Sequence, residues 1–257
     1  MNLLKTQDFI VNWVKNYAKK YSIKHLIVGV SGGVDSALTS KLCAMTQITT
    51  IVVSMPIHQN KTELKHANSH TKWLASKYKN IQIESIDLSM LFDEYKKTIP
   101  VKFQCDLSLA NARARIRMTT LYQIASHKKG LVVGTGNKIE DFGIGFFTKY
   151  GDGGVDISPI ADLTKSEVKK MAHFCGINKD ILDYPPTDGL WEDGRTDEDQ
   201  IGATYTELEW AMNYQNQHTL TKQEKKILET YRNLRTQNQH KMHAIPICKI
   251  PYELKSN

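Results

Sequence analysis

The sequence is poor in cysteine and contains no long apolar run, and both absences restrict what the protein can be. Its 257 residues include four cysteines, which are widely separated and form no Cys-x-x-Cys pair: Cys43, Cys105, Cys175 and Cys248. We therefore expect structural thiols rather than metal ligands, and no thiol-based catalytic group. No stretch approaches the roughly eighteen consecutive apolar residues of a membrane span, so no membrane association is expected.

The N-terminus lacks the pattern of a signal peptide. Over residues 1–17 the apolar side chains recur at amphipathic helical spacing, charges are interspersed and no small-residue cleavage site follows. A cytoplasmic location is therefore expected. With 40% hydrophobic and 24% charged residues the composition is that of an ordinary folded protein, and the length suits a single domain over residues 1–257.

The formal net charge of +7 does not by itself identify a partner. A basic excess can indicate nucleic-acid binding. Here, however, the lysines are scattered over helical stretches, for example at Lys15, Lys72 and Lys225. A small polyanionic substrate explains a modest excess equally well, and no nucleic-acid partner is expected.

Apolar β-like runs alternate with helical patterns along the first half of the chain. The runs are Leu26–Val30, Ile48–Met55, Ile81–Ile86 and Leu131–Gly134, and the helices are expected near Asp8–Tyr21, Ala37–Met45, Lys61–Tyr78 and Leu107–His127. Because the runs are continuously apolar, this order predicts an α/β fold, a Rossmann-like three-layer sandwich with a parallel sheet covered on both faces. Ligands of such sheets bind beyond the carboxyl ends of the strands.

The second half of the chain is expected to be mainly helical. A fifth short run, Val155–Ile160, precedes a helix expected to begin near Thr164, where Thr164-x-x-Glu167 has the spacing of a capping box. Two C-terminal helices are expected near Gln200–Tyr214 and Thr221–Asn238. Residues Asp183–Asp199 carry two prolines, two glycines and seven acidic residues. They are either a solvated surface loop or a mobile active-site loop.

The most informative segment is Ser31-Gly32-Gly33-Val34-Asp35-Ser36, which lies between the first apolar run and a helix. Its glycines allow the backbone to approach a ligand closely, and the N-terminus of the following helix favours an anion. Asp35 would repel a bare phosphate, so we expect a metal ion to bridge the two. The alternative is a tight turn with a Ser/Asp cap, but all six residues fit the anion site.

Further stretches carry candidate ligands for a nucleotide. They are the arginine-rich residues 111–122, the sequence GTGNKIE at 134–140, GFFTKYGDGGVD at 145–156, and PPTxxLW with TDE at 185–198. Arginine suits phosphates, although a solvated basic helix has the same pattern. Glu140 follows the fourth run, opposite Asp35, where both carboxylates and triphosphate oxygens would complete a Mg²⁺ site. The adjacent aromatics at 146–147 suit a stacked ring, although a glycine-rich turn is the alternative.

Together these segments resemble the ammonia-dependent NAD synthetase family of the ATP pyrophosphatase superfamily, whose loop is written Ser-Gly-Gly-x-Asp-Ser. The similarity extends from the first helix to His240-Lys241. It implies an ATP-dependent, amide-forming ligase that catalyses the last step of NAD biosynthesis. Mg-ATP adenylates the nicotinate carboxylate of deamido-NAD and releases pyrophosphate, and ammonia then displaces AMP to give NAD. The family is typically a homodimer with deamido-NAD bound at the subunit interface.

The resemblance also implies roles for individual residues. Asp35 and Lys165 would be catalytic, and Asp35 and Glu140 would bind Mg²⁺. The implied contacts to ATP and pyrophosphate are Gly29, Ser31, Gly32, Gly33, Val34, Asp35, Ser36, Thr135, Lys165 and Thr187, and those to deamido-NAD are Asn111, Arg113, Phe146, Lys149 and Asp152. On sequence alone, Lys165 could equally be a surface lysine early in a helix. Many relatives carry Asp-His where this chain has Gly136-Asn137, so this pair has no assigned role. His240 and Lys241 either close over the site or cap the last helix.

The length of chain before the Ser31–Ser36 segment bears on the source of ammonia. Thirty residues precede Ser31, which leaves no room for a glutaminase domain, so ammonia is expected to be free or delivered by a separate protein. A tRNA-modifying ATP pyrophosphatase is the first alternative function, but it would carry a catalytic cysteine pair or an RNA-binding domain. A nucleotide-binding module without catalysis is the second, and the two acidic positions Asp35 and Glu140 argue against it.

Overall fold

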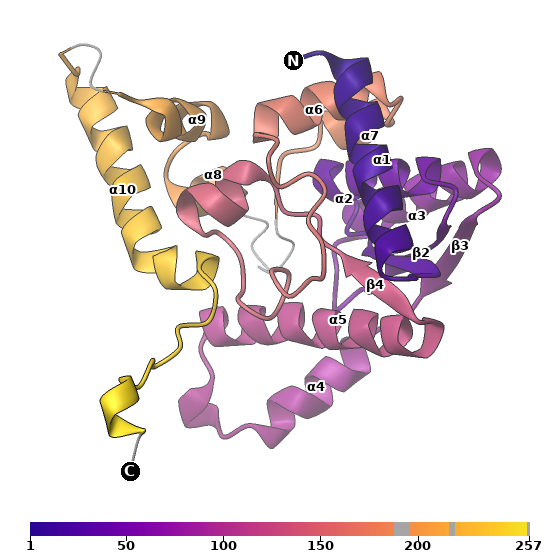
Figure 1. Cartoon of the computed structure of the whole chain (residues 1–257), viewed down its shortest axis with the longest axis horizontal. Helices are drawn as coiled ribbons and strands as arrows, with labels where there is room; N and C mark the ends of the chain where they lie inside the picture. The colour runs from indigo at the N-terminus through magenta and orange to yellow at the C-terminus, as the bar shows by residue number, and fades with distance from the viewer. Residues whose placement is uncertain (188–195, 216–218, 256–257) are drawn as a thin grey trace.

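The centre of the fold is a four-stranded parallel sheet, seen in a computed structural model that describes residues 1–187, 196–215 and 219–255 (Figure 1). Its strands are β1 (His25–Gly29), β2 (Thr49–Ser54), β3 (Ile81–Ser85) and β4 (Gly130–Val133). The strand order is β3-β2-β1-β4, and Ile27 pairs with Ile51 on one side and Val132 on the other. β1 therefore lies inside the sheet, with a neighbour on each edge.

Helices cover both faces of this sheet. On one side Leu26, Val28 and Val52 pack against buried residues of α1 (Leu3–Lys20), α2 (Val34–Met45) and α3 (Lys61–Lys77). On the other side Ile27 and Ile51 pack against α4 (Ser89–Thr98) and α5 (Asp106–Lys128). Alternate strand residues point to opposite faces, so one apolar run serves both cores. The predicted three-layer α/β fold is confirmed.

A second group of helices forms the C-terminal part of the molecule, which Figure 1 shows beside the sheet. Its members are α8 (Asp197–Ile201), α9 (Tyr205–Asn213), α10 (Lys222–Met242) and the π-helical segment η2 (Lys138–Ile144). They share a core in which Ile139 and Ile144 pack with Leu208 and Ile227. We call this group the C-terminal module. The remaining elements are α6 (Lys165–Phe174), α7 (Lys179–Leu182), η1 (Val101–Phe103) and η3 (Tyr252–Leu254).

Local signals explain most of the element boundaries. The capping box predicted at Thr164 is present, because the Thr164 side chain accepts from the backbone N–H of Glu167 while the Glu167 carboxylate accepts from that of Thr164. The helix predicted near Gln200–Tyr214 is present as α9, but it begins only at Tyr205 and is separate from the short α8 before it. Gly202 adopts a left-handed φ of 78° that ends α8, and Thr204 then caps α9 as a separate helix.

Two further elements differ from the sequence expectation. The run Val155–Ile160 forms no strand and contributes a single parallel bridge, between Ile157 and Val133. α4 was missed because Ser89–Thr98 buries only Phe92 among its ten residues, too few for a clear helical period. Within the described ranges, no helix is long and apolar enough to cross a membrane. All four cysteines are free thiols; Cys43 and Cys175 are buried and the other two are exposed.

Candidate active site

The segment Ser31–Ser36 comprises the turn after β1 and the first three residues of α2, at the carboxyl edge of the sheet. Hydroxyl groups inside the turn hold its shape: the backbone N–H of Ser31 donates to Ser36 Oγ (3.2 Å), and Ser36 Oγ donates to the carbonyl of Gly33 (3.0 Å). Gly32 has φ +99°, and a Cβ there would lie 2.4 Å from the carbonyl oxygen of Glu63. Only glycine fits at this position.

α3 supports the turn from outside. The amide of Gln59 donates to the Ser31 carbonyl (3.1 Å) and to Glu63 Oε2 (3.0 Å), and Glu63 is buried. The backbone of Ser31–Ser36 is thereby fixed between its own hydroxyls and α3. The N–H groups at the start of α2 face the open side of the turn, so the loop is preorganised to bind an anion.

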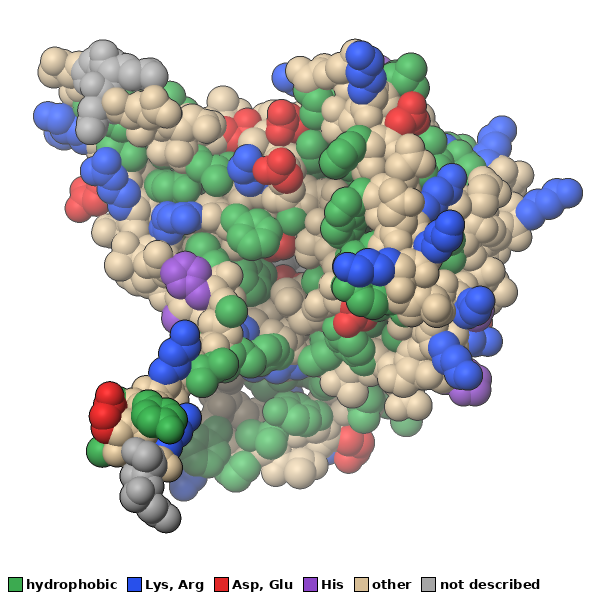
Figure 2. All heavy atoms as spheres, viewed as in Figure 1, with side chains coloured by type: hydrophobic (Ala, Val, Ile, Leu, Met, Phe, Trp, Pro, Cys, Tyr) green, Lys and Arg blue, Asp and Glu red, His purple; other side chains and the backbone are tan. Residues whose placement is uncertain are grey.

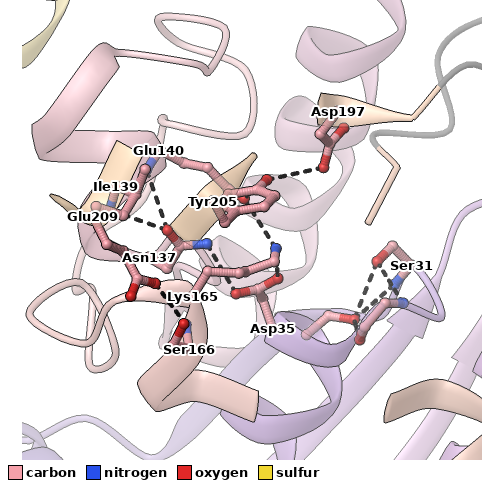
Figure 3. A network of polar contacts seen from close by, with 12 residues as sticks. Ser31, Asp35, Asn137, Ile139, Glu140, Lys165, Ser166, Asp197, Tyr205 and Glu209 are labelled. Carbon is pink, nitrogen blue, oxygen red and sulfur yellow. Dashed lines mark hydrogen bonds and ion pairs between the residues drawn. The ribbon is translucent and has the colours of Figure 1, made fainter. Parts of the chain in front are cut away.

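The most concentrated charge in the site is an ion-pair triad formed by Lys165, Asp35 and Glu140 (Figure 3). Lys165 Nζ lies 2.6 Å from Asp35 Oδ2 and 3.0 Å from Glu140 Oε1, and the lysine is only 3% exposed. Burial alone would lower the pKa of Lys165, but the charges of Asp35 and Glu140 outweigh it and raise the pKa. Lys165 is therefore a buried cation, and the surface-lysine alternative is wrong.

Asn137 connects the Asp35 carboxylate to the backbone at the start of η2. It is fully buried, its Oδ1 accepts from the N–H groups of Ile139 (3.1 Å) and Glu140 (3.2 Å), and its Nδ2 donates to Asp35 Oδ1 (3.1 Å). One side chain thus caps η2, which carries Glu140, and orients Asp35. Gly136 has a different reason to be glycine, because a Cβ there would lie 2.1 Å from the Asp141 carboxylate.

Tyr205 on α9 and Asp197 on α8 extend the polar network beyond the triad. The Tyr205 hydroxyl donates to Glu140 Oε1 (2.5 Å), and the hydroxyl oxygen of Tyr205 also lies 3.2 Å from Asp197 Oδ2. Burial, with the charges of Glu140 and Asp197, raises the pKa of Tyr205, so the hydroxyl stays protonated. The sequence analysis includes Asp197 in the Thr-Asp-Glu motif at 196–198 but assigns it no contact, and it assigns no role to Tyr205.

The carboxylate pair fits a magnesium ion. Asp35 and Glu140 approach the same point from opposite elements, since a single ammonium contacts both, and carboxylate oxygens are preferred Mg²⁺ ligands. In the described ranges no group of three His, Cys, Asp or Glu side chains is placed to hold a metal ion. A Mg²⁺ ion that accompanies a nucleotide usually has one or two carboxylate ligands, and phosphate oxygens and water molecules complete its coordination.

A cavity of about 260 Å³ opens over the loop and the triad. Figure 2 shows acidic side chains in the hollowed centre of this face. Of the predicted site residues, those that line the cavity are Gly29, Ser31, Gly33, Val34, Asp35, Ser36, Thr135, Glu140, Phe146, Asp152, Lys165 and Thr187. The structure therefore brings together residues that are spread over more than 150 positions of sequence.

The predicted residues outside the cavity lining are Gly32, Asn111, Arg113 and Lys149. Asn111 accepts from the hydroxyl of Thr148 (2.6 Å), and the Arg113 guanidinium lies over the ring of Phe92, 4.7 Å from its centroid. Arg117, four residues further on the same helix, lines the cavity instead and donates to the Met55 carbonyl (3.0 Å). The motif shows that arginines are present, but only the rotation of α5 decides which one enters the site.

The C-terminal helix is tied to the loop after η2. Lys149 donates to the carbonyl of His240 (3.0 Å), and Lys241 donates to the carbonyl of Phe147 (2.7 Å). His240 and Lys241 thus fasten α10 to the aromatic segment. Of the acidic stretch Asp183–Asp199, residues 188–195 lie outside the described residues, including Leu190 and Trp191. Thr187 lines the cavity, and Asp197 begins α8.

The fold and the site define an α/β protein with a glycine-containing turn and a buried lysine–carboxylate triad at the carboxyl edge of its sheet. The sequence profile of the NAD synthase family matches residues 6–245, so the chain belongs to that family. It is 43% identical over 133 residues to the NH(3)-dependent NAD(+) synthetase of Mycoplasmopsis pulmonis, a match covering 52% of this chain and 50% of that relative. The chain thus matches about half the length of that curated relative.

Two solved structures share the fold over nearly the whole chain. The NMN synthetase of Francisella tularensis has a TM-score of 0.87 at 28% identity, covering 97% of this chain and 100% of that one. The NH3-dependent NAD synthetase of Campylobacter jejuni, in complex with nitrate, has a TM-score of 0.79 at 24% identity with the same coverage. The second likeness shows the fold alone.

Proposed function

We propose that this protein is an ammonia-dependent NAD⁺ synthetase: it adenylates the nicotinate carboxylate of deamido-NAD with ATP and then amidates it with ammonia. The products are NAD⁺, AMP and pyrophosphate. The observation that carries the proposal is the buried triad of Lys165, Asp35 and Glu140 beside the Ser31–Ser36 loop. Family membership and the names of the curated relatives support the same reaction.

The chemistry requires stabilisation of a leaving group more than acid–base catalysis. In the adenylation step the carboxylate oxygen bonds to the α-phosphorus of ATP while the bond from that phosphorus to pyrophosphate breaks, so negative charge develops on the departing pyrophosphate. The N–H groups of the loop and the Lys165 ammonium, which line the same cavity, would bind that charge. Bound Mg²⁺, held by Asp35 and Glu140, would neutralise the phosphate oxygens and orient them.

The acid substrate would occupy the part of the cavity lined by Phe146 and Asp152, with the nicotinate ring against the aromatic side chain. Asn111, Lys149 and Arg113 lie outside the cavity lining, and each holds another contact: Asn111 with Thr148, Lys149 with His240 and Arg113 with Phe92. A homodimer with substrate at its interface, a cytoplasmic location and a single domain stay predictions.

A second candidate reaction is amidation of nicotinate mononucleotide. It is favoured by the likeness to the NMN synthetase of Francisella tularensis, which covers nearly all of both chains. Both reactions share the adenylation of a nicotinate carboxylate, so the triad and the loop serve either one. They differ in whether the substrate carries an adenylate half.

A direct assay tests both candidates. Purified protein with Mg-ATP is given deamido-NAD or nicotinate mononucleotide, with ammonium or glutamine as the nitrogen source, and pyrophosphate and the amide product are measured. We expect amidation with ammonium and little with glutamine, and a higher kcat/KM for deamido-NAD. A higher kcat/KM for the mononucleotide would select the second candidate, and no amide from either acid would refute the proposal.

Two variants provide the matched comparison. Asp35→Asn keeps the size of the side chain and removes the charge that holds Lys165, and we expect it to lose nearly all activity. Asp162→Asn removes a carboxylate from an exposed ion pair with Lys138, and we expect it to retain activity. Equal activity of both variants would contradict a role for Asp35.

A further inference from the structure

We propose that Tyr205 is a positioning residue of the site: its hydroxyl holds one oxygen of Glu140 and thereby presents the other oxygen to the metal ion that accompanies ATP. This inference rests on the proposed function. It concerns a residue of the C-terminal module that lies 65 positions from Glu140 in sequence.

The geometry assigns the Tyr205 proton to Glu140. The hydroxyl lies 2.5 Å from Glu140 Oε1 and 3.2 Å from Asp197 Oδ2 (Figure 3). A phenol carries one proton to donate, and the shorter contact takes it. A hydrogen bond from a neutral donor to a carboxylate is among the strong ones, so it restrains the Glu140 side chain.

The tyrosine ring is itself held in place. Tyr205 is 5% exposed, belongs to the core of the C-terminal module, and follows the capping residue Thr204 at the first turn of α9. Its backbone N–H donates to Glu198 Oε1 (2.9 Å), and the Lys165 ammonium lies 4.7 Å from the ring centroid. The hydroxyl therefore has a fixed position relative to the triad.

The two oxygens of Glu140 consequently have different roles. Oε1 accepts from both Lys165 and Tyr205, whereas Oε2 makes no hydrogen bond within the described part of the chain. Glu140 also lines the cavity. Without the Tyr205 hydroxyl, the terminal torsion of Glu140 is restrained from one side only, and such torsions have broad, nearly two-fold profiles. The oxygen offered to the cation is then less well defined.

The test compares nucleotide binding with and without metal. Binding of α,β-methylene-ATP is measured by calorimetry, once with excess Mg²⁺ and once with EDTA, for the wild-type protein and Tyr205→Phe. We expect the variant to bind the magnesium complex about 10-fold more weakly, as for the loss of one hydrogen bond to a charged group. Binding of the metal-free analogue should not change.

The matched control is Tyr231→Phe, which removes a hydroxyl from another buried tyrosine of the same core. We expect it to change neither binding constant. A double-mutant cycle with Glu140→Gln adds a second measurement: if Tyr205 acts through Glu140, Tyr205→Phe has little further effect on magnesium-dependent binding in that background. Additive effects would indicate an independent, structural role.

Three results would overturn the inference: equal weakening of both forms of the analogue, no weakening of either, or additivity in the cycle. Failure of the proposed function has a different signature. If the wild-type protein binds the analogue but forms no amide, the proposed reaction is refuted, whereas the positioning role of Tyr205 is still tested by the binding measurements. A wild-type protein that binds no analogue at all would contradict both.

Discussion

Replacing Lys165 by Met tests whether the triad is an electrostatic unit. Methionine fills a similar volume but carries no charge, so Asp35 and Glu140 would face each other without the ammonium that lies 2.6 and 3.0 Å from them. Breaking a buried ion pair destabilises a protein by about 3–5 kcal/mol. Because the two carboxylate side chains remain 17% and 16% exposed, we expect the lower end, about 3 kcal/mol.

Thermal melting near neutral pH measures this effect. For a chain of this size about 3 kcal/mol corresponds to a fall in Tm of roughly 6–12 °C. Lys138→Met is the matched control, because it also removes one positive charge, from an exposed pair with Asp162 that contributes about 0–1 kcal/mol. Millimolar Mg²⁺ should restore part of the Tm of Lys165→Met and raise that of the wild type less, since the cation replaces the missing charge.

The pH dependence follows from the raised pKa of Lys165. A lysine whose pKa is higher in the folded state stabilises the protein fully below its unfolded pKa of about 10.4, and the contribution falls as the pH rises above it. The difference in Tm between wild type and Lys165→Met should therefore be constant through the neutral range and shrink only in strongly alkaline solution. A loss of less than about 1 kcal/mol at neutral pH would refute the reasoning, because exposed pairs have that magnitude.

Two further predictions concern stability. His70 is buried with Nε2 2.9 Å from Ser40 Oγ, and burial lowers its pKa to about 4. Because an unfolded histidine titrates near 6.5, the free energy of unfolding should fall by about 3 kcal/mol as the pH drops from about 6.5 to 4, and urea denaturation of His70→Gln should lose this slope. Gly32→Ala should destabilise the protein by about 1–3 kcal/mol through its positive φ. Gly33→Ala should melt near the wild type, because Gly33 has φ −84° and a Cβ there would lie 3.5 Å from Ser31 Oγ, an ordinary contact distance.

Much of the architecture could be predicted from local sequence. β1 and β2 are apolar enough to be recognised anywhere in a chain, and the capping box at Thr164 marks a helix start without reference to other elements. The loop at Ser31–Ser36 was found because the strand, the glycines and the helix are contiguous. Signals of this kind depend only on residues a few positions apart in the chain, so they can be read from the sequence alone.

What the local pattern could not predict are contacts between distant elements. Nothing near Lys165 marks it as buried, because its burial depends on Asp35, 130 positions away, and on Glu140. Likewise, Asn137 is recognisable as a helix cap but not as a partner of Asp35, 102 positions away. Arg117 lines the cavity and Arg113 does not, because the rotation of α5 about its axis decides which arginine faces the site.

The sequence by itself therefore determined the α/β order, the strand–glycine–helix segment at Ser31–Ser36 and the residue types of the site. Each of these depends only on residues that are close together along the chain. Only the tertiary structure decided which charges meet. Packing of α6 on α2 brings Lys165 to Asp35, and packing of α9 on η2 brings Tyr205 to Glu140. The physical reason is that burial of apolar faces fixes the relative positions of helices, and the polar side chains they carry are placed by that packing.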